Sequence, residues 1–529
     1  MPLPTGGPWP PKNMYEITRK FDEWDAWYTG DPTKLRHAYQ RAQAVPSDRV
    51  AIDRVAQYRG GLLGIVARMW WGRPTGDLNK RHDELHIPIA ADLCQMSADL
   101  LFSEPPTLTV TDKGTQDRLD TLAGDSLHST LAESAEIGAA LGGVYLRVTW
   151  DTTVADAPFL TTVHADAAVP EFTWGRLSAV TFWRTLSTDG QQVLRYLERH
   201  ELDSNGVGII LHGLYEGSSQ GGSGFTGNRF TNDGELGRPV PLTEHPSTAG
   251  LAMMVDENSS ISTMSPGLAV VYVPNQRPQR RWRKDPVGAS LGRSDLDGVE
   301  PIMDALDETY SSWMRDVRLA KARLIVPEYM LQNLGAGRGA GFDADQEIYT
   351  PLSMPPADNN TSQITAQQFA IRFAEHKATS DELVATILRS VGYSAQTFGE
   401  GTAGGAVTAT EVMSKERRSY LTRDRKIRLF RPAIADAIEK VLAVDAAIFN
   451  SRVAVERPVV SFADEVQADP EALARTAQAL RLAQAASTAT LVQMQHPDWD
   501  GDEIAAEVAL VNAEAGMSVP SPFAGPAVP

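Results

Sequence analysis

One serine in the chain stands in the spacing of a catalytic turn. Gly288-Ala289-Ser290-Leu291-Gly292 fits the G-x-S-x-G pattern that exposes the nucleophilic serine of many hydrolases. That chemistry requires an apolar strand directly before the turn, so that the hydroxyl projects from a sharp bend. Here the preceding residues, 280–286, are charged and interrupted by proline. We therefore expect a glycine loop that leads into a helix, and a serine hydrolase using Ser290 stays as an alternative.

A second glycine pattern has the spacing of a dinucleotide-binding loop. Gly399, Gly401 and Gly404 fit G-x-G-x-x-G. Such a loop cradles phosphate when a β-strand precedes it and a helix follows it. Helices are predicted on both sides here, so the stretch is interpreted as a flexible connector between two long helices. No cofactor is expected.

Two histidines stand four residues apart in His82-Asp83-Glu84-Leu85-His86, as in the helix of zinc proteases. In that pattern the carboxylate beside the first histidine is Glu, and Asp83 is one methylene shorter. Pro88 also predicts that the helix begins after His86 rather than before it. We expect a loop of satisfied polar side chains here and no metal site.

Two clusters of basic residues complete the set of candidate sites. The first surrounds Trp282 and the second follows a predicted helix. Such clusters are usually solvated faces or subunit contacts, and contact with phosphate is the alternative. The clusters are Arg277, Arg280, Arg281, Arg283 and Lys284, and Lys415, Arg417, Arg418, Arg423, Arg425, Lys426, Arg428 and Arg431. As subunit-interface or phosphate contacts we select Arg281, Arg283, Arg417, Arg418 and Arg425.

The overall charge argues against a protein that grips nucleic acid tightly. The 529 residues include 49 Lys and Arg against 67 Asp and Glu, a formal net charge of −18. A protein that binds phosphates usually has a basic surplus. An acidic wall along which DNA slides without sticking is also compatible with this charge. The hydrophobic content of 42% indicates a globular chain.

The cysteine content and the lengths of the apolar runs indicate whether disulfides, a signal peptide or a membrane span are expected. Cys94 is the single cysteine, so no intrachain disulfide can form, and we expect a small core residue there. The proline-rich start lacks the basic and apolar regions of a signal peptide. No run approaches the roughly 20 apolar residues of a membrane span. No membrane contact is expected.

The order of predicted elements is helix, then sheet, then long helices. Residues 14–103 are mostly helical, and a helix at about 115–141 interrupts a series of strands. Residues 216–234 are predicted to be a loop. The strands are predicted at 107–111, 143–150, 159–164, 179–186, 192–200, 207–215 and 268–274.

Long helices are predicted in the second half of the chain. The first runs over 294–326, with Pro301 near its start, and the second over 364–391, with Gly392 as its C-terminal stop. Thr408 and Glu411 have the spacing of a capping box, so a third helix begins there and runs to about residue 444, with a kink before Pro432.

At this point the order of segments resembles the portal proteins of long-tailed bacteriophages. His86-Ile-Pro-Ile-Ala-Ala-Asp-Leu through Leu101-Phe-Ser-Glu-Pro-Pro resembles the helix that leads into the family's wing. Val273-Pro-Asn-Gln-Arg-Pro and Gly292-Arg-Ser-Asp-Leu resemble the entry to the stem. Gly405-Ala-Val-Thr-Ala-Thr-Glu-Val resembles the helix after the tunnel loop. Gln495-His-Pro-Asp-Trp with Glu503-Ile-Ala-Ala-Glu-Val resembles the C-terminal crown.

The resemblance implies an α+β portal fold with a mixed α/β wing, a stem of long helices, a clip and a helical crown. The implied parts are an extended N-terminal arm (1–13), wing (14–293), stem helix (294–326), clip (327–360), second stem helix (361–391), tunnel loop (392–407), long helix and wing return (408–468), crown (469–515) and disordered tail (516–529). The tunnel loop would line the DNA channel with Gly399, Glu400, Gly401, Thr402, Gly404 and Gly405. It carries no Lys or Arg, which argues against phosphate gripping there.

The resemblance also implies partners and a location. The chain would form a homo-oligomeric ring, of twelve subunits, at one capsid vertex of the virion, after assembly in the host cytoplasm. Double-stranded DNA would pass through the ring during packaging and ejection. Terminase, the head-tail adaptor, and the major capsid and scaffolding proteins would dock on it. Another homo-oligomeric head-tail component of the virion is the alternative. No enzymatic activity is expected.

Overall fold

The chain divides into two compact units. The computed structural model describes residues 3–43, 85–124, 126–219, 234–320, 323–325, 332–333, 340–341, 365–367, 371–398, 409–462, 470–496, 499 and 501–517. The first unit comprises Met1–Thr402 and Glu416–Ser461, and the second comprises Ala403–Lys415 and Phe462–Pro529. Across these described ranges, no helix has both the length and the apolar composition of a membrane span.

Six helices of the first unit contribute to its main hydrophobic core. They are α1 (Tyr15–Thr29), α2 (Pro32–Gln43), α4 (Ile89–Phe102), α6 (Ser126–Leu141), α8 (Glu300–Leu319) and α9 (Phe373–Val391). Each buries one apolar stripe. Near α1 the core is aromatic: the rings of Trp24 and Trp282 are 5.8 Å apart. Cys94 is fully buried in this core, which confirms its expected packing role, and burial raises the pKa of its thiol.

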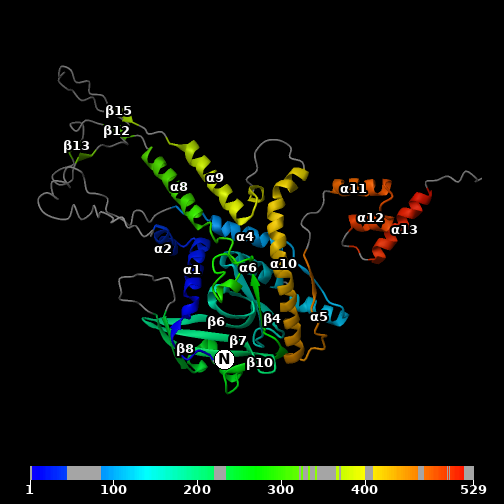
Figure 1. Cartoon of the computed structure of the whole chain (residues 1–529), viewed down its shortest axis with the longest axis horizontal. Coiled ribbons are helices and arrows are strands. Elements are labelled where there is room, and N and C mark those ends of the chain that lie inside the picture. Colours follow the sequence, from blue (N-terminus) through cyan, green and yellow to red (C-terminus); the bar gives the residue numbers. More distant parts are fainter. Residues whose placement is uncertain are drawn as a thin grey trace, which may run out of the picture. The chain divides into compact units, whose positions relative to one another are not determined.

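A seven-stranded antiparallel sheet is the largest β element of the first unit (Figure 1). Its order is β1-β9-β8-β7-β6-β5, and β10 pairs with β8 next to the region that pairs with β9. Gly190 and Gly206 adopt positive φ in the tight turns that connect β6 to β7 and β7 to β8. The strands are β1 (Pro8–Trp9), β5 (Ala168–Thr173), β6 (Arg176–Asp189), β7 (Gln192–Leu202), β8 (Val207–Ser219), β9 (Gly234–Val240) and β10 (Ser260–Pro266).

Smaller sheets and helices connect these layers. A three-stranded antiparallel sheet has the order β11-β3-β4, and β2 pairs with β16. These elements are β2 (Thr107–Thr109), β3 (Gly143–Thr149), β4 (Phe159–His164), β11 (Val270–Pro274) and β16 (Val459–Ser461), with the helices α2 (Pro32–Gln43), α5 (Lys113–Ala123) and α7 (Pro246–Ala249). The pairing of β2 with β16 joins residues about 350 positions apart, so the C-terminal end of the first unit is held by a strand from early in the chain.

Helices α8 and α9 pack side by side as an antiparallel pair (Figure 1). Trp313 near the end of α8 stacks on His376 near the start of α9, with ring centroids 6.1 Å apart. His376 and Arg372 also both contact Asp316, at 3.0 and 2.9 Å. Beyond these ends, β12 (Arg323–Ile325) pairs with β15 (Thr365–Gln367), and β13 (Gln332–Asn333) pairs with β14 (Ala340–Gly341).

Helix α10 (Ala409–Ile448) is 40 residues long and continues through Pro432. Its ring contact between Phe430 and Phe102 of α4 has a centroid distance of 5.6 Å. Near its C-terminal end, the buried Asp445 accepts two hydrogen bonds from Arg118 of α5, at 2.7 and 2.9 Å. The bidentate pair fixes the end of α10 against α5.

The second unit is helical. Helices α11 (Pro470–Leu482), α12 (Thr488–Gln495) and α13 (Gly501–Met517) pack in sequence order. The Ser487 hydroxyl accepts a hydrogen bond from the Thr490 amide at 3.2 Å and so caps α12.

The structure confirms the predicted fold class and most of the predicted strands. Helices and strands are mixed as in an α+β fold. The prediction missed the strands β1, β5, β9, β10 and β16. The predicted helix 115–141 is two helices, because Gly124 adopts a positive φ of 43° and ends α5. The predicted loop 216–234 begins later, since β8 continues to Ser219, and residues 220–233 lie outside the described part.

Further predictions needed correction. The extended N-terminal arm expected at residues 1–13 contains β1, which pairs with β9 of its own sheet, and Trp9 is buried against Trp183 and Leu197. The predicted helix 364–391 begins only at Phe373, because residues 365–367 form β15. The predicted helix 294–326 is shorter at both ends. Gly298, at φ 94°, keeps residues 294–298 in a turn, and residues 323–325 form β12.

Two other signals gave correct helix ends. Pro301 stands in the first turn of α8, and Gly392 ends α9 in the left-handed conformation, where its amide donates to the Leu388 carbonyl at 3.0 Å.

A close backbone approach at Gly142 predicts a large effect of a single methyl group. Gly142 has φ 86°, and a Cβ there would lie 2.8 Å from the Gly292 carbonyl oxygen and 2.9 Å from the Ser294 amide. We expect Gly142→Ala to lower the free energy of unfolding of the first unit by about 3 kcal/mol, from backbone strain plus overpacking. Denaturant unfolding followed by tryptophan fluorescence measures this.

Gly190 is the matched control, since it has φ 59° and no atom lies within 4 Å of the position that a Cβ would take there. Gly190→Ala introduces only the backbone strain, so we expect it to lower the free energy of unfolding by about 1 kcal/mol. Equal effects of the two substitutions would contradict the tight approach of the two backbones at Gly142.

Candidate functional site

A buried ion pair joins α10 to the segment that precedes α8. The Lys426 ammonium lies 2.5 Å from a carboxylate oxygen of Asp295, and the two side chains are 1% and 0% exposed. Lys426 also donates to the Ser97 hydroxyl of α4. A buried charge requires a complete set of partners, because each unpaired one costs several kcal/mol. The pair therefore fixes where α10 lies against α4 and the entry to α8.

Asp295 accepts three further hydrogen bonds from the surrounding segments. Asn275 and Gln276, directly after β11, donate to one carboxylate oxygen at 2.7 Å each. The Tyr393 hydroxyl, just after α9, donates to the other at 3.2 Å. Burial raises the pKa of Tyr393 well above its ordinary value, so its hydroxyl stays protonated as a donor. Three segments far apart in sequence thus converge on one carboxylate.

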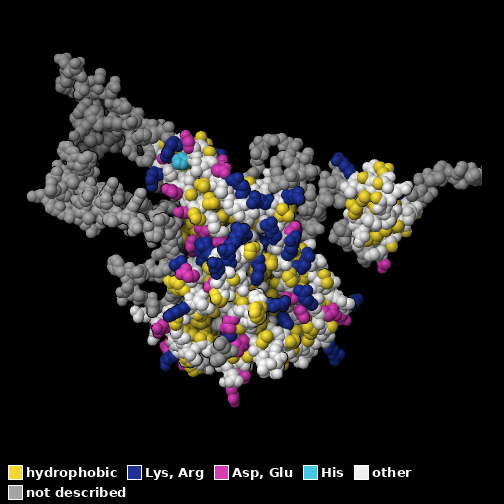
Figure 2. Space-filling model, viewed as in Figure 1, with side chains coloured by type: hydrophobic (Ala, Val, Ile, Leu, Met, Phe, Trp, Pro, Cys, Tyr) yellow, Lys and Arg dark blue, Asp and Glu magenta, His cyan; other side chains and the backbone are white. Residues whose placement is uncertain are grey.

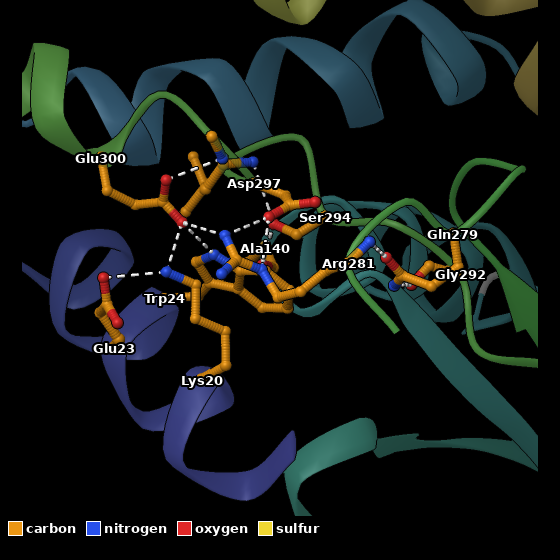
Figure 3. A network of polar contacts seen from close by, with 12 residues as sticks. Lys20, Glu23, Trp24, Ala140, Gln279, Arg281, Gly292, Ser294, Asp297 and Glu300 are labelled. Carbon is orange, nitrogen blue, oxygen red and sulfur yellow. Dashed lines mark hydrogen bonds and ion pairs between the residues drawn. The ribbon is translucent and has the colours of Figure 1, made fainter. Parts of the chain in front are cut away.

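A second polar network anchors the same segment to α1 (Figure 3). Glu300, at the start of α8, accepts from Lys20 at 2.6 Å and from the Trp24 indole at 2.9 Å. Burial opposes ionisation of Glu300, but Lys20 lowers its pKa below the ordinary value. Arg281 lies beside this network, 2.7 Å from Asp297 and 4.0 Å from Glu300. These contacts hold residues 275–300 as an ordered strap rather than a loose connection.

The two predicted basic clusters lie on one surface above these networks. Lys and Arg side chains gather across the middle of the face shown in Figure 2. Arg293 links the clusters: burial lowers its pKa first, and the charges of Arg280 from the strap and Arg425 from α10 lower it further. A cation lowers the pKa of another cation only when the two lie close together. We define the basic surface as seven cations of the strap and of α10, six of them exposed and Arg293 half-buried: Arg280, Arg283, Lys284, Arg293, Arg417, Arg425 and Arg428.

The five selected arginines differ in their surroundings. Arg281 is paired with Asp297, and Arg418 donates to the backbone carbonyl of Arg389 at 2.6 Å. Arg283, Arg417 and Arg425 are exposed, and no carboxylate in the described part of the chain pairs with them. Two cations that the sequence grouped with the surface cluster, Arg423 and Lys426, are buried and bond α4 instead. The helical period places them opposite the exposed row.

The other sequence candidates do not form an active site in the described residues. Ser290 lies in a short 3-10 helix, Gly288–Ser290, with turns and no strand before it, so the nucleophile turn is absent there. His86 contacts Asp307 of α8 at 2.9 Å rather than a metal, and His82 lies outside the described part. The glycine pattern at 399–404, with the other proposed channel residues, also lies outside it. Among described residues, no three His, Cys, Asp or Glu side chains gather as metal ligands.

A buried polar cluster in the large sheet escaped the sequence analysis. Glu198 of β7 pairs with Arg147 at 2.8 Å and with His200 at 2.7 Å. The Tyr196 hydroxyl lies 2.6 Å from a ring nitrogen of His212 on β8. The cluster borders a cavity of about 460 Å³. The sequence did contain a signal for this cluster. Residues 196, 198 and 200 lie on the same face of one strand because they alternate, and all three have polar side chains.

The charges of this cluster shift its pKa values. Burial opposes ionisation of Glu198, but Arg147 and then His200 bring its pKa well below the ordinary range. Burial lowers the pKa of His212 to about 4, although Glu198 partly offsets this. Near neutral pH the cluster therefore contains an ionised carboxylate and a neutral His212.

The comparisons with known proteins give the family. Residues 240–520, more than half of the chain, match the family described as phage portal protein, SPP1 Gp6-like. The chain belongs to this family of phage portal proteins.

Two further comparisons add less. A solved structure titled "Neck of empty GTA particle computed with C6 symmetry" is similar over 80% of this chain and 90% of that one, at 10% identity and a TM-score of 0.38. This similarity carries no part of the family assignment. No curated protein sequence matches the chain.

Breaking the buried pair is expected to be costly. Lys426→Met or Asp295→Asn alone leaves one uncompensated buried group, and we expect each to lower the unfolding free energy by about 3–5 kcal/mol. The double variant should recover part of the loss, which a double-mutant cycle in denaturant measures.

The exposed pair Lys377–Asp381 on α9, at 2.9 Å, is the matched control. The same two substitutions there should cost under about 0.5 kcal/mol. Strictly additive losses at Lys426 and Asp295 would show that the two groups do not act as a pair.

The pKa of His212 predicts a loss of stability in mild acid. Its folded pKa of about 4 lies below the unfolded value of 6.5, so the unfolded state binds the proton first as the pH falls. The stability that neutral His212 contributes to the folded state is therefore fully present above pH 6.5 and is lost between pH 6.5 and 4. Between pH 7.5 and 4.5 we expect His212→Gln to lose about 2–3 kcal/mol less than the wild type, measured by denaturant unfolding at each pH.

His496, which is exposed in the second unit, serves as the control. His496→Gln should leave the pH profile of the first unit unchanged. A His212→Gln profile that coincides with the wild type would exclude His212 as the titrating group.

Proposed function

We propose that the chain is the subunit of a portal ring at one capsid vertex, through which double-stranded DNA is packaged and ejected. The ring has twelve copies and belongs to the virion, after assembly in the host cytoplasm. Family membership supports the portal role. The ring size, the passage of DNA and the vertex are parts of the proposal.

The observation that carries the proposal is the antiparallel pair α8 and α9. An insertion separates the two helices in sequence, and β12 and β15 pair at its two ends, so the chain returns to the point where it left the helix pair. Paired helices with a closed insertion at one end suit a stem that carries a clip. The buried bond between Tyr393 and Asp295 holds the other end of the pair.

The remaining parts follow from this assignment. The helices and sheets of 14–293 form the wing, the clip lies within 327–360, and 408–468 forms the long helix and the return to the wing. Helices α11, α12 and α13 form the crown, 469–515. The segment 392–407 between α9 and α10 is the tunnel loop, and Glu400 is its acidic candidate at the channel. At −18 per subunit, a ring is strongly negative, which suits passage of DNA without trapping.

The partners of the ring belong to the same proposal. Terminase and the head-tail adaptor dock on the clip, at different stages of assembly. The major capsid and scaffolding proteins contact the ring where it is built into the vertex.

Negative-stain electron microscopy of the purified full chain tests the ring. We expect closed rings with a central stain-filled hole, because a closed cyclic assembly uses one heterologous interface throughout. Mass photometry of the same sample should give one dominant species of about twelve times 57.5 kDa.

A persistent monomer or dimer from low to high salt would contradict the portal assignment. Esterase assays of the wild type and Ser290→Ala would then address the hydrolase alternative. Open or helical polymers instead of closed rings would favour another head-tail component of the virion.

A further inference from the structure

The basic surface contains six exposed cations that no carboxylate in the described part of the chain neutralises. Arg280, Arg283 and Lys284 of the strap, and Arg417, Arg425 and Arg428 of α10, are all exposed. Within the described ranges, none of the six has a carboxylate partner. Lysines and arginines that hold the fold are paired, as Lys20, Arg281 and Lys426 are. The six unpaired cations are therefore available to a partner.

The exposed row of α10 has the composition of a protein contact rather than of a phosphate contact. Arg417, Leu421 and Arg425 follow one another at four-residue spacing, and Arg428 continues the row. Leu421 is 47% exposed in the middle of this row, and Asp424 is exposed beside it. A phosphate backbone gains nothing from an exposed leucine and is repelled by Asp424. A protein surface with carboxylates around an apolar contact fits the row.

An acidic pair with complementary spacing lies on α8 of the same chain. Asp304 and Glu308 are one helical turn apart, and no cation in the described part of the chain pairs with either. Burial raises the pKa of Asp304 first, and the charges of Asp307 and Glu308 raise it further. The carboxylates of α8 thus repel each other, as the cations of the basic surface do.

The two charged surfaces stand apart within one subunit. In Figure 1, α8 and α10 lie on different sides of α9. Within the described residues, no ion pair joins Asp304 or Glu308 to a cation of α10. Two copies related by rotation can bring the surfaces together. In a cyclic ring each subunit presents two different faces, and each face meets the other face of a neighbour.

We infer that the basic surface of one subunit docks on the acidic pair of α8 in the neighbouring copy. Arg425 and Arg428 face Asp304 and Glu308, with Leu421 at the centre of the contact. This inference rests on the proposed ring and specifies which faces close it. Like-charge repulsion inside each subunit is relieved when the ring forms, so charge favours the assembled state over the free chain.

Charge reversal tests the contact. Arg425→Glu/Arg428→Glu should reduce the fraction of chains in rings at least about tenfold, because carboxylates would then face carboxylates. Asp304→Lys/Glu308→Lys should have a similar effect alone. Combined in one chain, the four substitutions should restore rings, which a defect in folding would not allow. Mass photometry and negative-stain microscopy at low and moderate salt give the readout.

Arg176→Glu/Arg452→Glu is the matched control, since these two arginines are exposed and unpaired on other elements. It should leave the rings intact. The milder Arg425→Gln/Arg428→Gln is expected to lower the ring fraction less, and more steeply as salt rises.

The outcomes separate this inference from the proposed function. Wild-type rings together with undisturbed rings of the Arg425/Arg428 reversal would overturn the interface and leave the portal role standing. If the Arg425/Arg428 reversal leaves the rings intact but they no longer retain a labelled DNA duplex, the basic surface binds nucleic acid. That result would also overturn the proposed interface. A failed rescue by the fourfold variant would exclude α8 as the opposing face. Absence of wild-type rings would overturn both.

Discussion

The structure of the first unit depends on the buried pair between Lys426 and Asp295. An ionised carboxylate inside a protein is tolerated only when its hydrogen-bond partners are complete and well placed. Asp295 meets this condition by drawing one or two donors from each of three segments: the end of β11, the end of α9 and the middle of α10. The directional bonds leave little freedom to any of these segments. Apolar packing is less directional than these bonds, so the buried pair is what fixes the position of α10 along its axis.

This constraint also determines what the surface presents. Because Lys426 points inward, the opposite side of the same helix turns outward and carries Arg417, Arg425 and Arg428. The strap is held from beneath by Asp295 and from the side by Glu300, so its cations occupy fixed positions beside that row. A chain with a large acidic excess therefore displays a concentrated positive surface. Its buried charges organise the fold, and its unpaired exposed charges remain for a partner.

Local sequence signals predicted the individual helices and strands of this arrangement but not the contacts between them. Gly392 and Pro301 each determine one end of their own helix through backbone conformation, and the structure confirms both. Both basic clusters were also identified. Their union, and the burial of Lys426 within one of them, depend on contacts between residues 131 positions apart, which no local pattern encodes. The edge strands were missed for the same reason: β1 is two residues long and exists because β9 offers it a partner.

Charge is a suitable means of closing a ring of identical subunits. Apolar faces that attract each other without direction would also join two copies in wrong orientations. Opposite charges on separate faces favour head-to-tail contacts and oppose contacts between two like faces. Their reach of about 10 Å at moderate salt orients subunits before they touch, and screening keeps early mistakes reversible. In the proposed interface, the exposed Leu421 adds short-range apolar contact once the charges have aligned. A subunit that must add in one orientation many times over gains more from this selectivity than from a stronger but less directional surface.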